Sequence, residues 1–178
     1  RDDVESRGLG DVYKRQGKGL SWFRDTGYAQ LIEEIDKTEG SKPIAVIFNL
    51  GVNDLGNAGN YVSYMTSIAS TLKSKNCKLF YMSVNPINST MITKAGRGAR
   101  TEAQVREFNS KIRSGLSLDY KYIDMYSVLM KKGYGTNARY DGVDDGDDGL
   151  HYTTKTFKRI YYYCITYLNT GSINASYY

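Results

Sequence analysis

The chain has 178 residues, of which 40% are hydrophobic, so it is long enough to build one core of ordinary size. Its formal net charge is +5, but lysines and arginines are interspersed with acids and form no basic stripe, so a nucleic-acid-binding protein is not expected. No apolar run approaches the roughly 20 residues of a membrane-spanning helix, and no membrane span is expected. Two cysteines are too few for a disulfide scaffold or a cysteine-type metal centre.

Strands and helices alternate along the first half of the chain. Residues 28–37 predict a helix, and residues 43–50 form a nearly continuous apolar run that is typical of a strand buried on both faces of a parallel sheet. The following helix has one apolar stripe at helical spacing, made of Val62, Met65, Ala69 and Leu72.

The same alternation continues through the middle of the chain. Residues 77–84 predict a second strand, which stops at Pro86 because proline cannot donate to a sheet. Residues 85–100 are expected to form a long polar loop of functional length. Thr101 and Gln104 then form a capping-box pattern, which predicts a helix with a core face of Val105, Phe108 and Ile112.

A short third strand is expected at residues 120–124, followed by a glycine-rich and acid-rich loop over residues 133–149. The last helix carries one apolar stripe, and the tail after Asn169 is expected to fray. Alternating strands and helices predict an α/β fold with an open parallel sheet covered on both faces. The stripe of the last helix consists of Phe157, Ile160, Tyr161, Cys164, Ile165 and Leu168.

The cysteines, the tyrosines and an acidic loop each have a simple structural interpretation. Cys77 and Cys164 are expected to be buried free thiols, and a disulfide would require the fold to bring them close. The 17 tyrosines suggest half-exposed positions and carbohydrate contacts. The acidic loop at residues 141–148 fails the pattern of a calcium-binding EF-hand at Val143 and Tyr152, so a solvated loop without metal is expected.

The only histidine of the chain lies in residues 148–151, Asp-Gly-Leu-His. A carboxylate three residues before a histidine can fold back onto the imidazole Nδ1–H and fix the tautomer. Asp148 would then orient the ring, and His151 would use Nε2 as a general base. An ordinary Asp-Gly turn beside a histidine is the alternative interpretation.

A second motif, Gly-Val-Asn-Asp at residues 51–54, follows the first predicted strand. Ligands of open α/β sheets bind at the carboxyl ends of the strands, where this motif lies. Asn53 could point its amide into a cleft as a hydrogen-bond donor to an oxyanion. Alternatively, Asn53 or Asp54 could simply cap the next helix.

These motifs resemble two of the four blocks of the SGNH (GDSL-type) hydrolases, a family of α/β esterases. Asn53 matches the third block, and Asp148 with His151 matches the last. Residues 17–22 resemble the second block, in which a glycine donates its backbone N–H to the oxyanion; Gly19 is the better match and Gly17 the alternative.

The resemblance implies a three-layer flavodoxin-like fold with a five-stranded sheet in the order 2-1-3-4-5. It also implies a nucleophilic serine in a Gly-Asp-Ser segment after the first, central strand, and no such segment occurs in the 178 residues. Ser6 follows no apolar strand, and residues 10–12 read Gly-Asp-Val. We therefore expect a truncated chain without its first strand, with a gap between strands that should be paired.

Residues 11–16 resemble translated adapter sequence from metagenomic assemblies. We therefore expect residues 1–16 to be a non-native leader, residues 17–169 an incomplete SGNH-like domain and residues 170–178 a frayed tail. Trp22 and Asn88 are candidate substrate-lining residues, with core packing as the alternative for Trp22 and an ordinary polar loop for Asn88.

The function that the resemblance implies is a serine esterase that needs no metal or organic cofactor. Acetylated carbohydrate is the expected substrate class, and a bacterial source is expected. An extracellular or cell-surface location is expected because such enzymes often work outside the cell. A non-catalytic carbohydrate-binding domain of the same fold is the alternative. The sequence leaves the oligomeric state open.

Because the central strand and its nucleophilic serine are expected to be missing, the 178-residue chain should be poorly stable and catalytically silent. Purified protein should hydrolyse p-nitrophenyl acetate no faster than a His151→Ala control, as measured by the release of p-nitrophenolate. Hydrolysis well above that control would contradict the prediction.

Overall fold

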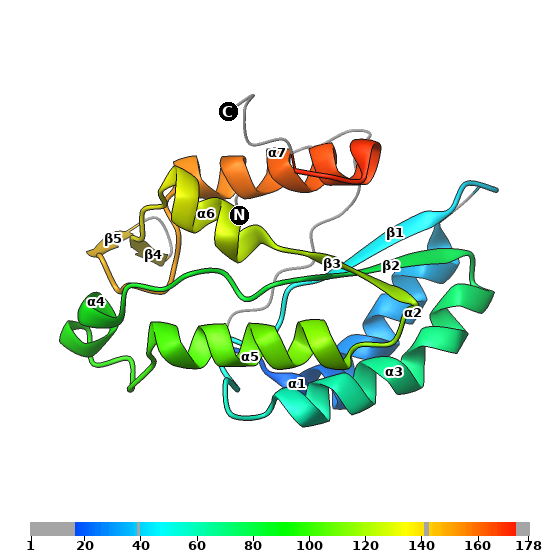
Figure 1. Ribbon diagram of the computed structural model, residues 1–178, viewed down its shortest axis with the longest axis horizontal. Coiled ribbons are helices and arrows are strands. Elements are labelled where there is room, and N and C mark those ends of the chain that lie inside the picture. Colours follow the sequence, from blue (N-terminus) through cyan, green and yellow to red (C-terminus); the bar gives the residue numbers. More distant parts are fainter. Residues whose placement is uncertain (1–16, 39, 141–142, 174–178) are drawn as a thin grey trace.

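The computed structural model describes residues 17–38, 40–140 and 143–173 of the chain (Figure 1). They form an α/β fold around a parallel sheet, as the sequence predicts. The elements in chain order are α1 (Leu20–Trp22), the π-helical turn η1 (Phe23–Gly27), α2 (Tyr28–Lys37), β1 (Ile44–Phe48), α3 (Ala58–Ser74), β2 (Cys77–Met82), α4 (Ser89–Lys94), α5 (Glu102–Gly115), β3 (Tyr120–Ile123), α6 (Met125–Lys132), β4 (Ala138–Tyr140), β5 (Val143–Gly146) and α7 (Thr154–Thr170).

The main sheet has three parallel strands in the order β1-β2-β3, and a separate antiparallel hairpin joins β4 to β5. Val46 of β1 lies opposite Leu79 of β2, which lies opposite Tyr120 of β3. The expected gap inside the sheet is therefore wrong for the described residues. A gap needs a strand on each side, whereas residues 20–37 are helical and β1 is an edge strand of this sheet.

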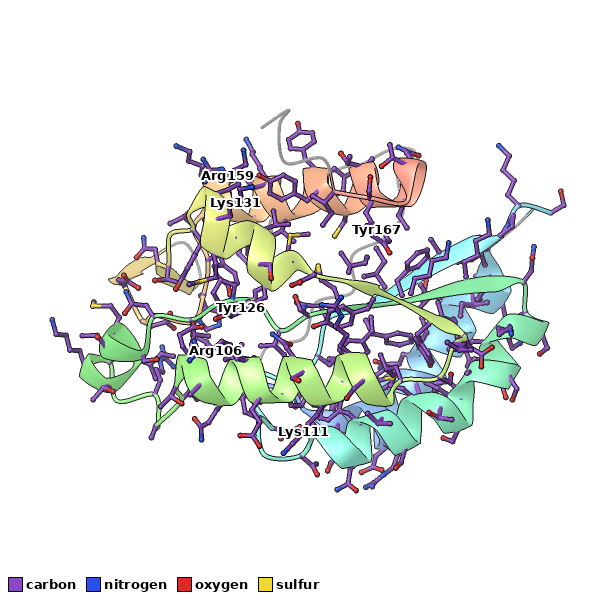
Figure 2. The ribbon with its side chains drawn as sticks, in the orientation of Figure 1. Arg106, Lys111, Tyr126, Lys131, Arg159 and Tyr167 are labelled. Carbon is purple, nitrogen blue, oxygen red and sulfur yellow. The ribbon has the colours of Figure 1, made fainter. Side chains whose placement is uncertain are left out.

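Helices cover the two faces of the sheet unequally (Figure 1). The larger core lies on the side of α2, α3 and α5, and includes Met65, Leu72 and Phe108. The smaller core lies under α6 and α7, where Tyr167 points from α7 towards the sheet and donates to the Tyr122 carbonyl at 3.3 Å (Figure 2).

Burial along β1 follows its edge position. Val46 and Phe48 are buried in the larger core, but Ile47 is only half-buried and Ala45 is exposed. The expectation that this strand is buried on both faces is therefore wrong. The reason is that the smaller core is centred on β2 and β3, so it reaches β1 only at Ile47.

Most predicted elements are confirmed by the structure. The helix at residues 28–37 and the strands β1, β2 and β3 lie where the sequence places them. The Thr101–Gln104 capping box is formed, and it begins α5. Val105, Phe108 and Ile112 are fully buried beneath it.

Three regions depart from the sequence prediction. The expected loop at residues 85–100 contains α4, because the Asn88 side chain caps that helix by accepting from Met91 N at 3.2 Å. The chain after β3 forms α6, which begins at the cap Asp124. The expected loop at residues 133–149 contains the β4–β5 hairpin.

The apolar stripe of α7 is rotated relative to the prediction. Ile160 and Cys164 are buried as expected, but Phe157 is 40% exposed and Tyr163 is buried in its place.

None of the helices within the described ranges is long and apolar enough to cross a bilayer.

Most of the described tyrosines are half-buried, as the sequence suggests, but a few are fully buried in the cores. Tyr61, Tyr81 and Tyr163 are among the largest fully buried side chains. Tyrosine hydroxyls also donate to backbone carbonyls of loops, as Tyr81 does to Leu50 at 2.9 Å and Tyr134 does to Ile87 at 2.8 Å. A tyrosine can thus fill a core and satisfy an irregular backbone segment at the same time.

Both cysteines are free and buried, as expected. Cys77 belongs to the larger core and Cys164 to the smaller one, where its sulfur lies 3.5 Å from that of Met82.

Gly51 is required by the fold. Its φ is +123°, and a Cβ atom there would lie 2.3 Å from Cζ of the buried Phe108. Gly51→Ala should therefore lower the free energy of unfolding by about 2 kcal/mol or more. Urea denaturation measures the change, and Gly56→Ala is the matched control because nothing lies within 4 Å of the position that its Cβ atom would take. Equal stabilities of the two variants would contradict the prediction.

Candidate functional site

Asp148 and His151 form a close carboxylate–imidazole pair. Asp148 Oδ2 lies 2.6 Å from His151 Nδ1, while Asp148 Oδ1 accepts from the backbone N–H groups of Leu150 and His151. The Asp148 side chain is 4% exposed and that of His151 is 22% exposed. Because a carboxylate can only accept, the neutral ring carries its proton on Nδ1 and keeps the lone pair of Nε2 for other partners.

Glycine and backbone contacts hold this pair in place. Gly149 has a φ of +72°, and a Cβ atom there would lie 2.3 Å from the Asn88 carbonyl oxygen. The Asn88 N–H donates to the Gly149 carbonyl at 2.8 Å, and the Asn137 N–H donates to the His151 carbonyl at 2.7 Å. The segment 148–151 is therefore fixed from two sides.

Asp148 is an ionised carboxylate in this setting. Its burial raises the pKa, but the hydrogen bonds from the backbone and ring of His151 and from the backbone of Leu150 outweigh that effect and lower the pKa overall. A buried carboxylate of this kind is suited to orienting an imidazole and to stabilising an imidazolium.

Asn53 lies in the turn after β1, and its amide has a defined orientation. Its Nδ2 donates to the Lys18 carbonyl at 3.0 Å, and its Oδ1 accepts from Arg100 Nη2 at 3.2 Å. Since Nδ2 carries two N–H groups, one remains for a ligand.

Asp54 joins this turn to the glycine block. Its carboxylate accepts from Leu20 N at 2.7 Å and from the Tyr61 hydroxyl at 2.8 Å. Gly19 lies against it so closely that a Cβ atom would be 2.1 Å from Asp54 Oδ2. Burial and the hydrogen bond to Asp54 raise the pKa of Tyr61, so the phenol stays a donor. Asp54 therefore caps the helix of the glycine block, and the sequence alternative that it caps the helix after it is wrong.

The loop after α4 contacts both motifs at one end of the molecule, through Arg100 at Asn53 and through Arg97 at Asp148. A cavity of about 250 Å³ is lined by Val52, Asn53, Arg97 and Arg100, among others. Arg97 Nε also lies 3.8 Å from Asp148 Oδ2. The α4 helix and the β4–β5 hairpin lie at this same end, on the left of Figure 1.

A second, smaller cavity of about 70 Å³ also lies between the motifs. Val52 lines it from one motif and Leu150 from the other. Asn85 lines it as well, and its Oδ1 is buried without a hydrogen-bond partner within the described part of the chain. This oxygen can therefore accept a hydrogen bond from a group that enters the cavity.

The structure places the other candidate residues as follows. Asn88 uses its side chain to cap α4 and its backbone to hold Gly149. Trp22 packs half-buried against the larger core, with its ring over Gly27, and lines neither cavity. Ser6 and residues 10–12 lie outside the described residues.

Sequence reasoning missed Arg97 and Arg100. They belong to a segment without hydrophobic periodicity, and only the glycines at positions 96 and 98 indicated that the backbone turns there. Their role depends on contacts with residues far away in the sequence: Arg100 contacts Val52 and Asn53, and Arg97 contacts Asp148.

Within the described ranges, no three histidine, cysteine or acidic side chains are grouped in a way that could hold a metal ion. Comparison with known proteins gave no match to a family model, a curated protein or a solved structure. A function can therefore be proposed only from the geometry of the site and the sequence motifs.

The Asp148–His151 pair should make stability depend on pH. Because the folded pKa of Asp148 is lowered, its contribution is present above the ordinary carboxyl pKa of about 3.9 and is lost as the pH falls through the folded value. Asp148→Asn should therefore cost about 1–3 kcal/mol at pH 7, and the cost should shrink below about pH 4. Urea titrations at several pH values measure this, with the exposed Asp36→Asn as control. A pH-independent cost would show that the carboxylate charge does not matter.

Proposed function

We propose that residues 17–169 carry part of the active site of an SGNH-type serine esterase. The observation that supports the proposal best is the 2.6 Å contact between Asp148 Oδ2 and His151 Nδ1, which lies at the same end of the molecule as Asn53. The order of the motifs along the chain agrees with the family pattern as well.

In the proposed reaction, a serine hydroxyl attacks the ester carbonyl while His151 Nε2 accepts its proton. His151 then returns that proton to the departing alcohol, and water hydrolyses the acyl-enzyme in the same way. Asp148 keeps the imidazole in the required tautomer and stabilises its charged form. The serine is one that the 178 residues do not supply in a Gly-Asp-Ser segment, so the chain alone would be inactive.

Asn53 and Gly19 would bind the oxyanion. The remaining N–H of Asn53 Nδ2 is one donor, and the backbone N–H of Gly19 is the second. The contact between the two segments supports this pairing, because Asn53 donates to the carbonyl of Lys18, the residue next to Gly19.

The finer fold proposed here is the flavodoxin-like sheet of that family. In the order 2-1-3-4-5, the observed β1, β2 and β3 would be the third, fourth and fifth strands. The serine-bearing first strand would then pair with the edge of β1, which has no neighbour on that side within the described residues. The proposed substrates are esters of carbohydrates, acetylated sugars above all.

The complete reading frame at the source locus tests the proposal. We expect it to encode a Gly-Asp-Ser segment after an apolar strand, ahead of Gly17, and we expect a fluorophosphonate probe to label that serine stoichiometrically. A frame that opens just before Arg1 would instead favour the non-catalytic binding domain. A complete protein that is not labelled would overturn the esterase.

In that complete protein, Asn53→Ala should lower kcat by about 10²–10³, because one oxyanion donor is lost. Steady-state hydrolysis of p-nitrophenyl acetate measures the effect. Asn60→Ala is the matched control, since this exposed asparagine of α3 hydrogen-bonds Asn57 and lines neither cavity. An unchanged kcat in Asn53→Ala would remove Asn53 from the mechanism.

A further inference from the structure

We propose that the cavity beside Asn53 binds a carboxylate of the substrate, so that the preferred esters are those of anionic sugars such as uronates. This inference rests on the proposed function, because it specifies the substrate class of the same site. It is carried by Arg100 and Arg97, two cationic side chains that the proposed ester chemistry does not use.

All charged side chains that line the cavity are positive, and the carboxylate of Asp148 lies beside Arg97 but outside the lining. Arg97 and Arg100 line it, and no aspartate or glutamate is among its lining residues. A concave surface lined by one sign of charge concentrates ligands of the opposite sign. The other lining residues are uncharged, and they include Val52, Asn53, Leu55 and Gln104.

Arg100 is held rigidly without losing its charge. Its Nε donates to the Val52 carbonyl at 3.0 Å, its Nη1 to the Arg97 carbonyl at 2.6 Å and its Nη2 to Asn53 Oδ1 at 3.2 Å. All three acceptors are neutral oxygens. One N–H on each terminal nitrogen remains, which matches the two oxygens of a carboxylate.

Arg97 is positioned by the loop that follows α4. Gly96 and Gly98 on either side of it have φ values of +64° and +81°, and the Arg97 N–H donates to the Ile92 carbonyl at 3.1 Å. Its guanidinium lies 3.8 Å from Asp148 Oδ2, so it spans the distance between the cavity and the Asp148–His151 pair.

Gln104 adds a neutral donor to the same cavity wall. Its Oε1 serves the capping box with Thr101, and its NH₂ group makes no hydrogen bond to the described residues. The volume of about 250 Å³ lies just below the range of small-molecule sites, roughly 300–1,000 Å³, so the cavity suits one sugar unit better than a long chain.

Isothermal titration of the 178-residue protein with D-glucuronate and with D-glucose tests the proposal, because the two sugars differ only in the carboxylate. We expect glucuronate to bind at least about tenfold more tightly. This advantage should decrease between low salt and about 0.5 M NaCl, since exposed charges are screened.

Three variants separate recognition from folding. Arg97→Gln should remove most of the preference for glucuronate. Gln104→Glu should do the same, because it places a negative charge on the cavity wall while a Thr-x-x-Glu sequence keeps the capping box. Lys94→Gln is the control: it removes one positive charge at an exposed position of α4, away from the cavity lining, and should leave the preference intact. Thermal unfolding checks that all three variants remain folded.

Equal affinity for both sugars, binding of neither sugar, or an unchanged preference in folded Arg97→Gln and Gln104→Glu would overturn the proposal. The readout is binding and not hydrolysis, so the two proposals fail separately. Tight glucuronate binding beside a complete protein that resists fluorophosphonate would reject only the esterase. Equal affinities beside a labelled serine would reject only the preference for anions.

Discussion

The arrangement of this protein depends on how the backbone is satisfied where the chain leaves the sheet. Residues 83–88 follow β2 inside the molecule, and no strand pairs with most of them. Buried N–H and C=O groups need partners, and here side chains from other elements provide them. Asn109 of α5 accepts from Val84 N and donates to the Val84 carbonyl, both at 2.8 Å, while Tyr152 donates to the Pro86 carbonyl at 2.6 Å.

The same constraint determines where polar chemistry can gather. The segments after β1 and β2 are irregular but firmly held, so they can carry side chains that point into a cavity without losing their shape. Glu102 is a charged side chain that holds the backbone and takes no part in the site. It accepts from Ile87 N and from the Tyr126 hydroxyl. Tyr126 lies between α6 and α5 near Arg106 (Figure 2). The Glu102 carboxylate holds the framework and does not line either cavity.

Local patterns in the sequence were sufficient for much of the fold. Apolar periodicity located α2, α3 and the three strands, and the Thr101–Gln104 capping box located the start of α5. Position in the sheet was not predictable in this way, because Ala45 and Ile47 are exposed or half-buried only through the edge position of β1. The same distinction applies to the site. The Asp148–His151 contact is local in sequence and was predicted. The contacts of Arg100 span up to 48 residues of sequence and were not predicted.

The reactivity of the two buried cysteines reports on local opening of the two cores. Burial raises the pKa of the Cys77 thiol and raises that of Cys164 to about 11, so neither is an effective nucleophile in the folded chain. Because they lie in different cores, alkylation of Cys77 measures how often the larger core is breached, and alkylation of Cys164 measures the same for the smaller core. The rates of alkylation at Cys77 and Cys164 therefore measure the opening of the larger and the smaller core separately.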